Sequence, residues 1–299
     1  MKTRKPQVDY ATKEEVLIKA LPYIQRYEGK TFVIKYGGAA MTDEQLKQTF
    51  AKDVTLLRKI GINIVIVHGG GKEITEISTA LGIETKFVNG QRYTDAKSIN
   101  VVLMVLAGLV NKEIVNLINT NGGNAVGLCG VDNTLLRARK QTTNGTDLGL
   151  VGTIVAVNVP FINLLLGNGM MPVIAPIGVG DAGEIYNVNA DLAAGAVATA
   201  LKAEKLVYLS DVEGILVNDK LVSTLTQTEA DTFMKQGAIF GGMIPKVSSA
   251  FETLSAGVKK VHIVDGRVKH SLLLEIFTDE GIGTQMIHDQ DNDAEPNQV

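Results

Sequence analysis

The feature that most constrains the fold is a repeated alternation of short, apolar, β-branched segments with longer segments of helical periodicity. Strands that are apolar throughout are typical of sheets covered by helices on both faces. The sequence therefore predicts an α/β fold, a three-layer αβα sandwich around a central, mainly parallel sheet, with an additional N-terminal helix. The expected strands are 31–35, 63–67, 124–128, 171–175, 206–209 and 260–264, and the expected helices are 43–59, 72–81, 95–119, 190–202, 228–236 and 245–256.

Residues 134–157 differ, because strand-like flanks surround the polar, glycine-containing segment QTTNGTDLG. This pattern predicts a β-hairpin. No Pro/Ser-rich linker divides the chain, so a division into two lobes has to come from topology. We expect an N-terminal lobe at 29–180, a C-terminal lobe at 181–288 and a disordered acidic tail at 289–299.

The segment 1–28 carries apolar residues at helical spacing, from Val16 to Ile24. Two interpretations are open. It is either a helix packed on its own domain or an arm that reaches another subunit. Pro22 should bend this helix or limit its length.

Composition excludes several classes of protein. A chain with 45% hydrophobic residues and a net charge of −3 is not expected to be disordered. The single cysteine, Cys129, excludes a disulfide scaffold and favours a reducing, cytoplasmic location. The four histidines show no metal-ligand spacing, and no basic face points to nucleic acid. We find no signal peptide and expect no apolar run of the roughly 18 residues that a membrane span needs.

Two glycine clusters lie where a phosphate would bind. Gly37-Gly38 and the HGGG at 68–71 each follow an expected strand and precede a helical pattern. Glycine lets backbone N–H groups approach an anion, and a helix N-terminus adds partial positive charge. A tight turn would explain either cluster alone, but Lys35 precedes the first and Lys246 follows a third glycine pair, Gly241-Gly242. The alternatives for these lysines are a snorkelling strand residue and an ordinary surface residue.

A fourth glycine cluster, at 178–183, matches G-x-G-x-x-G but is followed by a strand pattern where the dinucleotide fingerprint requires a helix. We expect it to be a turn between two strands.

Taken in order, KYGG at 35–38, HGGG at 68–71, GQR at 90–92, NVNAD at 187–191, SD at 210–211 and GGMIPK at 241–246 resemble the amino acid kinase superfamily, and in detail its members that phosphorylate N-acetyl-L-glutamate. The resemblance spans about residues 21–287. One departure is Lys72, where family members commonly carry proline after HGGG.

The resemblance implies the amino acid kinase fold and transfer of the γ-phosphoryl group of ATP to the side-chain carboxylate of N-acetyl-L-glutamate. A carboxylate is already ionised at neutral pH, so the reaction needs no general base. Mg²⁺ would be held mainly by ATP oxygens and water, with no metal site on the protein. The implied roles are catalysis by Lys35, Lys246 and Asp191, substrate binding by Gly70, Gly71, Arg92 and Asn187, and nucleotide binding by Gly37, Gly38, Ser210, Asp211, Gly241, Gly242 and Met243.

The helix segment ALPYI at 20–24 and the stretch 270–284 resemble the arginine-sensitive members of the family. This implies a homo-oligomer, a hexameric trimer of dimers, inhibited by L-arginine in arginine biosynthesis. The implied effector residues are Tyr23, His270, Glu275 and Gly281. Docking of a regulatory protein stays open, as do two other functions: another kinase of the superfamily, such as glutamate 5-kinase, and a catalytically inactive nucleotide- or anion-binding protein.

Overall fold

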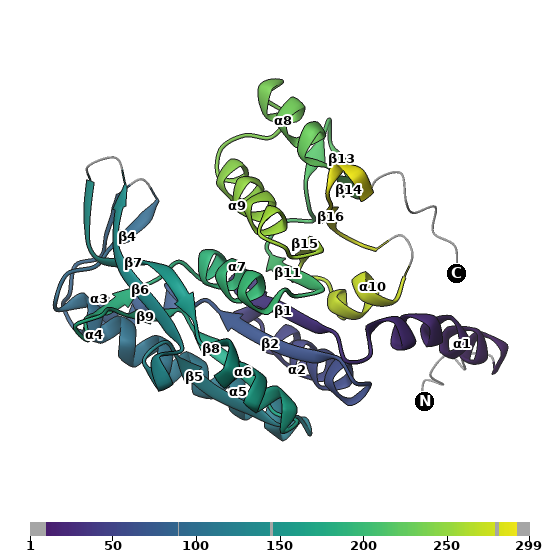
Figure 1. Ribbon diagram of the computed structural model, residues 1–299, viewed down its shortest axis with the longest axis horizontal. Helices are drawn as coiled ribbons and strands as arrows, with labels where there is room; N and C mark the ends of the chain where they lie inside the picture. The colour runs from purple at the N-terminus through teal and green to yellow at the C-terminus, as the bar shows by residue number, and fades with distance from the viewer. Residues whose placement is uncertain (1–9, 89, 144–145, 279–280, 292–299) are drawn as a thin grey trace, which may run out of the picture.

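The protein is built on one eight-stranded sheet, seen in the computed structural model, which describes residues 10–88, 90–143, 146–278 and 281–291 (Figure 1). The strand order is β14-β16-β15-β11-β1-β2-β8-β5, and only the β15–β16 pair is antiparallel. The six predicted strands are confirmed to within one residue at each end. The strands are β1 (Thr31–Tyr36), β2 (Asn63–His68), β5 (Ala125–Cys129), β8 (Met171–Ala175), β11 (Lys205–Ser210), β14 (Thr224–Leu225), β15 (Lys260–Asp265) and β16 (Thr284–Met286).

Helices cover both faces of this sheet and give it two apolar cores. Along β1, Phe32 and Ile34 face one core and Val33 faces the other. The first core is covered by α2 (Glu44–Lys59), α3 (Gly71–Ala80), α4 (Ser98–Leu103), the π-helical segment η2 (Met104–Val110), α5 (Asn111–Thr120) and α10 (Ser271–Phe277). The second is covered by α6 (Val159–Gly167), α7 (Ala190–Leu201), α8 (Gln227–Lys235) and α9 (Met243–Ser255). The predicted three-layer αβα sandwich is therefore confirmed.

The predicted hairpin is also present, as β6 (Leu136–Thr143) and β7 (Thr146–Val157). Together with β9 (Ile177–Val179) and β10 (Ile185–Asn187) it closes into a four-stranded ring beside the main sheet. The cluster at 178–183 is confirmed as a turn, because β9 pairs antiparallel with β10 and Gly180 N donates to Glu184 O.

Several short elements were not predicted. They are the hairpins β3 (Lys86–Val88) with β4 (Gln91–Tyr93) and β12 (Leu216–Val217) with β13 (Lys220–Leu221), the helices α6 and α10, the strands β14 and β16, and the 3₁₀ turns η1 (Gly38–Met41), η3 (Asp132–Thr134) and η4 (Asp289–Asp291).

The long helix expected at 95–119 is α4, η2 and α5 in succession, and it corrects one sequence expectation. Residues 98–120 are long and apolar enough to cross a membrane by length and composition, whereas no such run was expected. The segment is this apolar because it packs inside the protein. Of its most apolar window, 44% is buried, and Val102, Leu106 and Ile118 lie in the first core.

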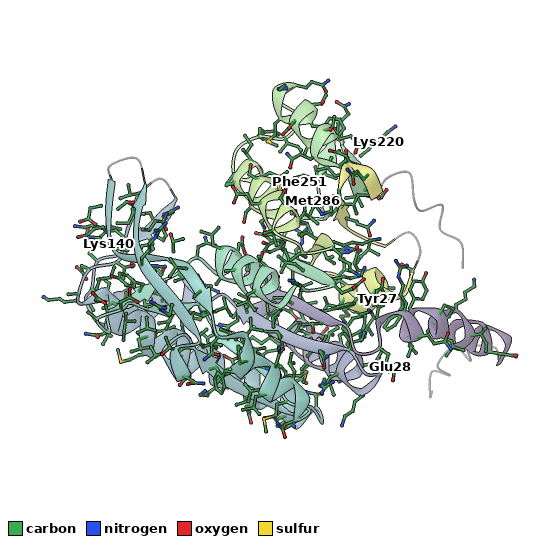
Figure 2. The ribbon with its side chains drawn as sticks, viewed as in Figure 1. Tyr27, Glu28, Lys140, Lys220, Phe251 and Met286 are labelled. Carbon is green, nitrogen blue, oxygen red and sulfur yellow. The ribbon has the colours of Figure 1, made fainter. Side chains whose placement is uncertain are left out.

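The N-terminal helix α1 (Tyr10–Tyr27) continues through Pro22, which the sequence analysis expected to bend or shorten it. Its C-terminal end packs on its own domain. Tyr23 meets Phe277 edge to face, and Tyr27 is buried against Phe32. Figure 2 labels Tyr27 at the end of α1 that lies nearest α10. The rest of α1 projects away from the sheet beyond α10 (Figure 1), with Ile18 63% exposed. Residues 1–9 lie outside the described part.

The two predicted lobes share the one sheet, with β5, β8, β2 and β1 on one side and β11, β15, β16 and β14 on the other. Their boundary stays a prediction. At the C-terminus, order extends past residue 288, because η4 follows and Asp289 accepts a hydrogen bond from Thr228 N. The rest of the predicted tail, 292–299, lies outside the described residues.

Candidate functional site

The first two glycine clusters meet at one edge of the sheet. β1 and β2 are adjacent and parallel, with Tyr36 in register with His68, so the loops that follow them start side by side. Gly69 N donates to Tyr36 O over 2.8 Å, and a Cβ built on Gly69 would lie only 3.8 Å from Gly37 Cα. The carboxyl ends of parallel strands are where open α/β sheets bind ligands.

The glycines of these loops have different reasons for being glycine. Gly70 has φ +154°, and a Cβ there would come within 2.5 Å of Leu106 Cδ2. Gly38 and Gly71 have no heavy atom within 4 Å of an added Cβ. Gly70 is thus required by packing, whereas the space on the side-chain side of Gly38 and Gly71 is open.

Lys35 leaves the end of β1 and folds back over the first loop. Its Nζ lies 3.0 Å from Asp191 Oδ1, and a Cβ on Gly37 would lie 2.9 Å from the same Nζ. Asp191 stands in the first turn of α7, which is capped by Asn189, whose side chain accepts from Asp191 N. The predicted pair of Lys35 and Asp191 is therefore in contact.

Lys246, in the first turns of α9, donates from Nζ to Ser210 Oγ over 2.9 Å. Burial lowers the pKa of Lys246, the charge of Asp191 opposes that shift, and Lys35 adds to it. Both lysines and Asp191 therefore act on one another electrostatically. The direct partner of the Lys246 ammonium is Ser210 at the end of β11, a residue predicted for nucleotide binding.

Arg92 and Asn187 converge from two other elements. Arg92, on β4, donates from Nη2 to Gly71 O and to Thr75 Oγ1, both over 2.8 Å, and its guanidinium lies over the Phe87 ring. Asn187, at the end of β10, donates to Thr94 Oγ1 over 3.1 Å. Arg92 therefore lies on β4 and is bonded directly to the HGGG loop, and Asn187 is bonded to Thr94, the residue that follows β4.

The third glycine pair opens α9. Gly241 has φ +57°, and neither Gly241 nor Gly242 has a heavy atom within 4 Å of an added Cβ. Met243 begins the helix and packs against the second core, while Asp211 follows Ser210 at the end of β11. These residues present open backbone beside Lys246.

The predicted effector residues separate into two groups. Glu275 on α10 accepts from Ile282 N and Gly283 N, and a Cβ on Gly281 would lie 2.8 Å from its Oε2. Tyr23 reaches the same end of α10 through Phe277. His270 lies at the other end of α10, where its Nδ1 is 2.6 Å from Asp53 Oδ1 on α2.

Two residues beside Glu275 were missed by sequence reasoning. His262 Nδ1 lies 2.6 Å from Glu275 Oε1, and Lys205 Nζ lies 3.2 Å from His262 Nε2. Burial lowers the pKa of Lys205 to about 7 and that of His262 to about 4. Burial would raise the pKa of Glu275, but the hydrogen bond and charge of His262, the Ile282 N–H and the charge of Lys205 together outweigh burial, and the pKa is lowered. A lysine and a histidine inside otherwise apolar strands were the available signal.

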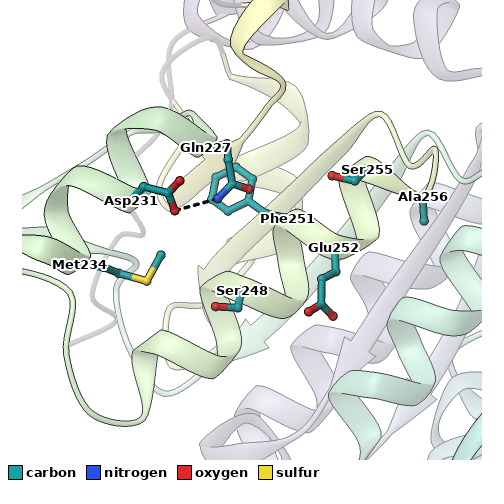
Figure 3. Close-up of a pocket in the computed structure, with 8 residues that line it drawn as sticks. All are labelled: Gln227, Asp231, Met234, Ser248, Phe251, Glu252, Ser255 and Ala256. Carbon is teal, nitrogen blue, oxygen red and sulfur yellow. Dashed lines mark hydrogen bonds between the residues drawn. The ribbon is translucent and has the colours of Figure 1, made fainter.

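Two further observations bear on ligands. Over the described ranges, no group of three or more His, Cys, Asp or Glu side chains could hold a metal ion. An open pocket between α8 and α9 is lined by none of the predicted site residues (Figure 3). Its lining residues are Gln227, Asp231, Met234, Ser248, Phe251, Glu252, Ser255 and Ala256.

The fold and the site together define an α/β protein with a cluster of lysines and glycine loops at the carboxyl edge of its sheet. The sequence matches the amino acid kinase family over residues 30–265, and the chain belongs to that family. It is 57% identical over 272 residues to the acetylglutamate kinase of Chlorobaculum parvum, covering 91% of this chain and 90% of that protein. It is 55% identical to the acetylglutamate kinase of Thermoanaerobacter pseudethanolicus, covering 93% and 94%. The family and enzyme class expected from the sequence are thus confirmed, and the chain is a phosphotransferase.

Solved structures agree on the fold. An N-acetylglutamate synthase from Neisseria gonorrhoeae, complexed with coenzyme A and N-acetyl-glutamate, superposes with a TM-score of 0.82 at 29% identity, over 93% of this chain and 63% of that one. Carbamate kinase from Giardia lamblia bound to AMP-PNP superposes with a TM-score of 0.63 at 18% identity, over 87% of this chain and 99% of that one, and shows the fold alone.

Proposed function

We propose that this protein transfers the γ-phosphoryl group of ATP to the side-chain carboxylate of N-acetyl-L-glutamate, giving N-acetyl-L-glutamyl 5-phosphate and ADP. The observation that carries the proposal is the convergence of Lys35, Asp191 and Lys246 beside open glycine backbone. Relatives that are 55% and 57% identical over most of the chain are called acetylglutamate kinase, which supports the choice of substrate.

In this proposal the two lysines neutralise the charge that develops on the phosphoryl oxygens. A carboxylate nucleophile is already ionised, so positioning and electrostatic stabilisation carry most of the catalysis. Asp191 orients Lys35 through their 3.0 Å contact, and Ser210 holds the Lys246 ammonium. The backbone N–H groups of Gly38, Gly70 and Gly71 supply further hydrogen bonds without needing to reorganise.

The N-acetyl-L-glutamate would bind on the side of Arg92 and Asn187. The guanidinium of Arg92 would pair with the α-carboxylate in the bidentate manner that a lysine cannot reproduce. Asn187 would donate to the N-acetylated end. Support comes from the N-acetylglutamate synthase of the same fold, whose structure is described as a complex with N-acetyl-glutamate.

ATP would bind on the opposite side, along Ser210, Asp211 and residues 241–243. The open backbone at Gly241 and Gly242 and the ammonium of Lys246 suit a triphosphate. Mg²⁺ would be held mainly by ATP oxygens and water, and when bound it neutralises phosphate charge. The chain's own contribution would be the charge of Lys35 and Lys246.

We further propose feedback inhibition by L-arginine, in a cytoplasmic hexamer built as a trimer of dimers within arginine biosynthesis. The projecting part of α1 supports a contact with another subunit, since Ile18 and Leu21 are 63% and 47% exposed. Tyr23, Glu275 and Gly281 gather where α1 meets α10, and they would form the effector site there. A related N-acetylglutamate synthase structure, 26% identical, is described as complexed with L-arginine.

One assay tests the substrate. ATP consumption is measured with N-acetyl-L-glutamate, L-glutamate and L-aspartate offered separately. Turnover with N-acetyl-L-glutamate is expected to exceed the others by at least tenfold in kcat/KM. Preference for free glutamate would instead favour a glutamate 5-kinase, and no turnover with any acceptor would favour an inactive nucleotide- or anion-binding protein.

A further inference from the structure

His68, the first residue of the HGGG loop, is fully buried and hydrogen-bonded through both ring nitrogens. Nδ1 lies 2.7 Å from Gly69 O, and Nε2 lies 3.1 Å from Asn111 Nδ2. An amide nitrogen can only donate, so Nε2 accepts and Nδ1 carries the proton that it donates to Gly69 O. Burial lowers the pKa of His68 to about 4, which agrees with a neutral ring at neutral pH.

Asn111 is itself held rigidly from three sides. Its Nδ2 also lies 2.9 Å from Val173 O on β8 and 3.4 Å from Leu128 O on β5, and its Oδ1 accepts from Lys112 Nζ over 3.1 Å. A side chain on Gly127 would overlap Asn111 Oδ1. A buried amide satisfied in this way has one orientation, because any other leaves polar groups unpaired in the core.

The helix that carries Asn111 also packs against the HGGG loop. Asn111 begins α5 directly after the π-helical segment η2, and π-helical turns are frequent at functional sites. Within η2, Leu106 and Val110 would lie 2.5 and 3.4 Å from a Cβ on Gly70. The helix therefore meets the glycine loop twice, at Gly70 through packing and at Gly69 through His68.

Fixing the Gly69 carbonyl fixes an N–H group as well. The Gly69 carbonyl and the Gly70 N–H belong to the same planar peptide unit and point in opposite directions. Because His68 Nδ1 holds the Gly69 carbonyl, the Gly70 N–H points away from the His68 ring.

We propose that Asn111 is a positioning residue that, acting through His68 and the Gly69 carbonyl, aims the backbone N–H of Gly70 at the transferring phosphoryl group. The proposal rests on the proposed function for the identity of that group. Asn111 itself touches no ligand in this scheme.

The main test compares two leucine variants on one helix. Asn111→Leu removes the bond to His68. The matched control, Asn119→Leu, removes an asparagine two turns along α5 that bonds to the backbone of Ala125 on β5, away from the loop. Asn111→Leu is expected to lower kcat by about 10- to 100-fold, the scale of a misplaced oxyanion donor, with KM for ATP changed less than about twofold. Asn119→Leu is expected to leave kcat within about twofold.

Unchanged kcat in folded Asn111→Leu, or an equal loss in Asn119→Leu, would overturn the proposal. A second pair covers the case in which Asn111→Leu does not fold. His68→Asn keeps a donor next to the Gly69 carbonyl, whereas His68→Leu does not, so His68→Asn should retain about tenfold more kcat. Equal activity of these two variants would also count against the proposal.

Amide hydrogen exchange separates this idea from the proposed function. Asn111→Leu should accelerate exchange in the peptide that contains residues 69–71, whereas Asn119→Leu should not. If the wild-type protein shows no turnover with N-acetyl-L-glutamate, the proposed function fails. The exchange result alone then decides whether Asn111 positions the glycine loop. Exchange unchanged by Asn111→Leu overturns the positioning role.

Discussion

Lys246 is half-buried, and its ammonium is influenced by the charges of both Asp191 and Lys35. Replacing it with alanine removes positive charge that matters most when negative charge spreads over the phosphoryl oxygens. Lys246→Ala is therefore expected to lower kcat by about 10²-fold or more, with smaller changes in both KM values, as steady-state kinetics would show. Lys259→Ala, which removes an exposed partner of Glu204, is the control. A change confined to KM would contradict the role of Lys246.

Arg92 differs from the lysines because its planar guanidinium already makes three hydrogen bonds and stacks on Phe87. A lysine keeps the charge but neither the planar fork nor the stacking. Arg92→Lys should raise KM for N-acetyl-L-glutamate about tenfold and leave KM for ATP within about twofold. The measurement is a pair of substrate titrations. An equal rise in both KM values would argue that Arg92 supports the fold and not the acceptor site.

The loop from His68 to Gly71 depends on glycine at position 70. Gly70→Ala is expected to destabilise the protein by about 2–4 kcal/mol, because φ +154° strains any L-residue and the new methyl group meets Leu106. Gly71→Ala, which meets no atom within 4 Å, should change stability by less than about 1 kcal/mol. Chemical denaturation of both variants is the measurement. Equal stabilities would show that the Leu106 side chain moves aside at little energetic cost.

At the same scale, sequence patterns predicted some elements well and missed others for a clear reason. β1, β2, β8, β11 and β15 are buried on both faces, so nearly every position had to be apolar and the runs stood out. β14 and β16 are two and three residues long, and the β3–β4 hairpin is partly exposed. Such short segments carry too few residues to establish a period.

The proposed hexamer belongs to the scale of the whole molecule, and α1 is its predicted determinant. Deletion of residues 1–28 is expected to give dimers with weaker inhibition by L-arginine. It also removes Tyr27, which is 4% exposed and packs on Phe32, so deletion of residues 1–19 is the sharper variant. Light scattering and inhibition curves provide the measurement. A hexamer with unchanged sensitivity to arginine would contradict the role of α1.

The sequence by itself determined the αβα class, the central strands and the glycine loops with their lysines, because each is a local pattern of burial or backbone freedom. Only the tertiary structure determined which groups meet. Asn111 reaches His68 across 43 residues, Lys205 reaches His262 across 57, and Lys35 reaches Asp191 from another element. Such pairs leave no periodic trace, because the contact forms only when the sheet brings distant segments together. For the same reason, His68 was part of a recognised motif while Asn111, the residue that fixes its tautomer, lay unnoticed in an apolar helix.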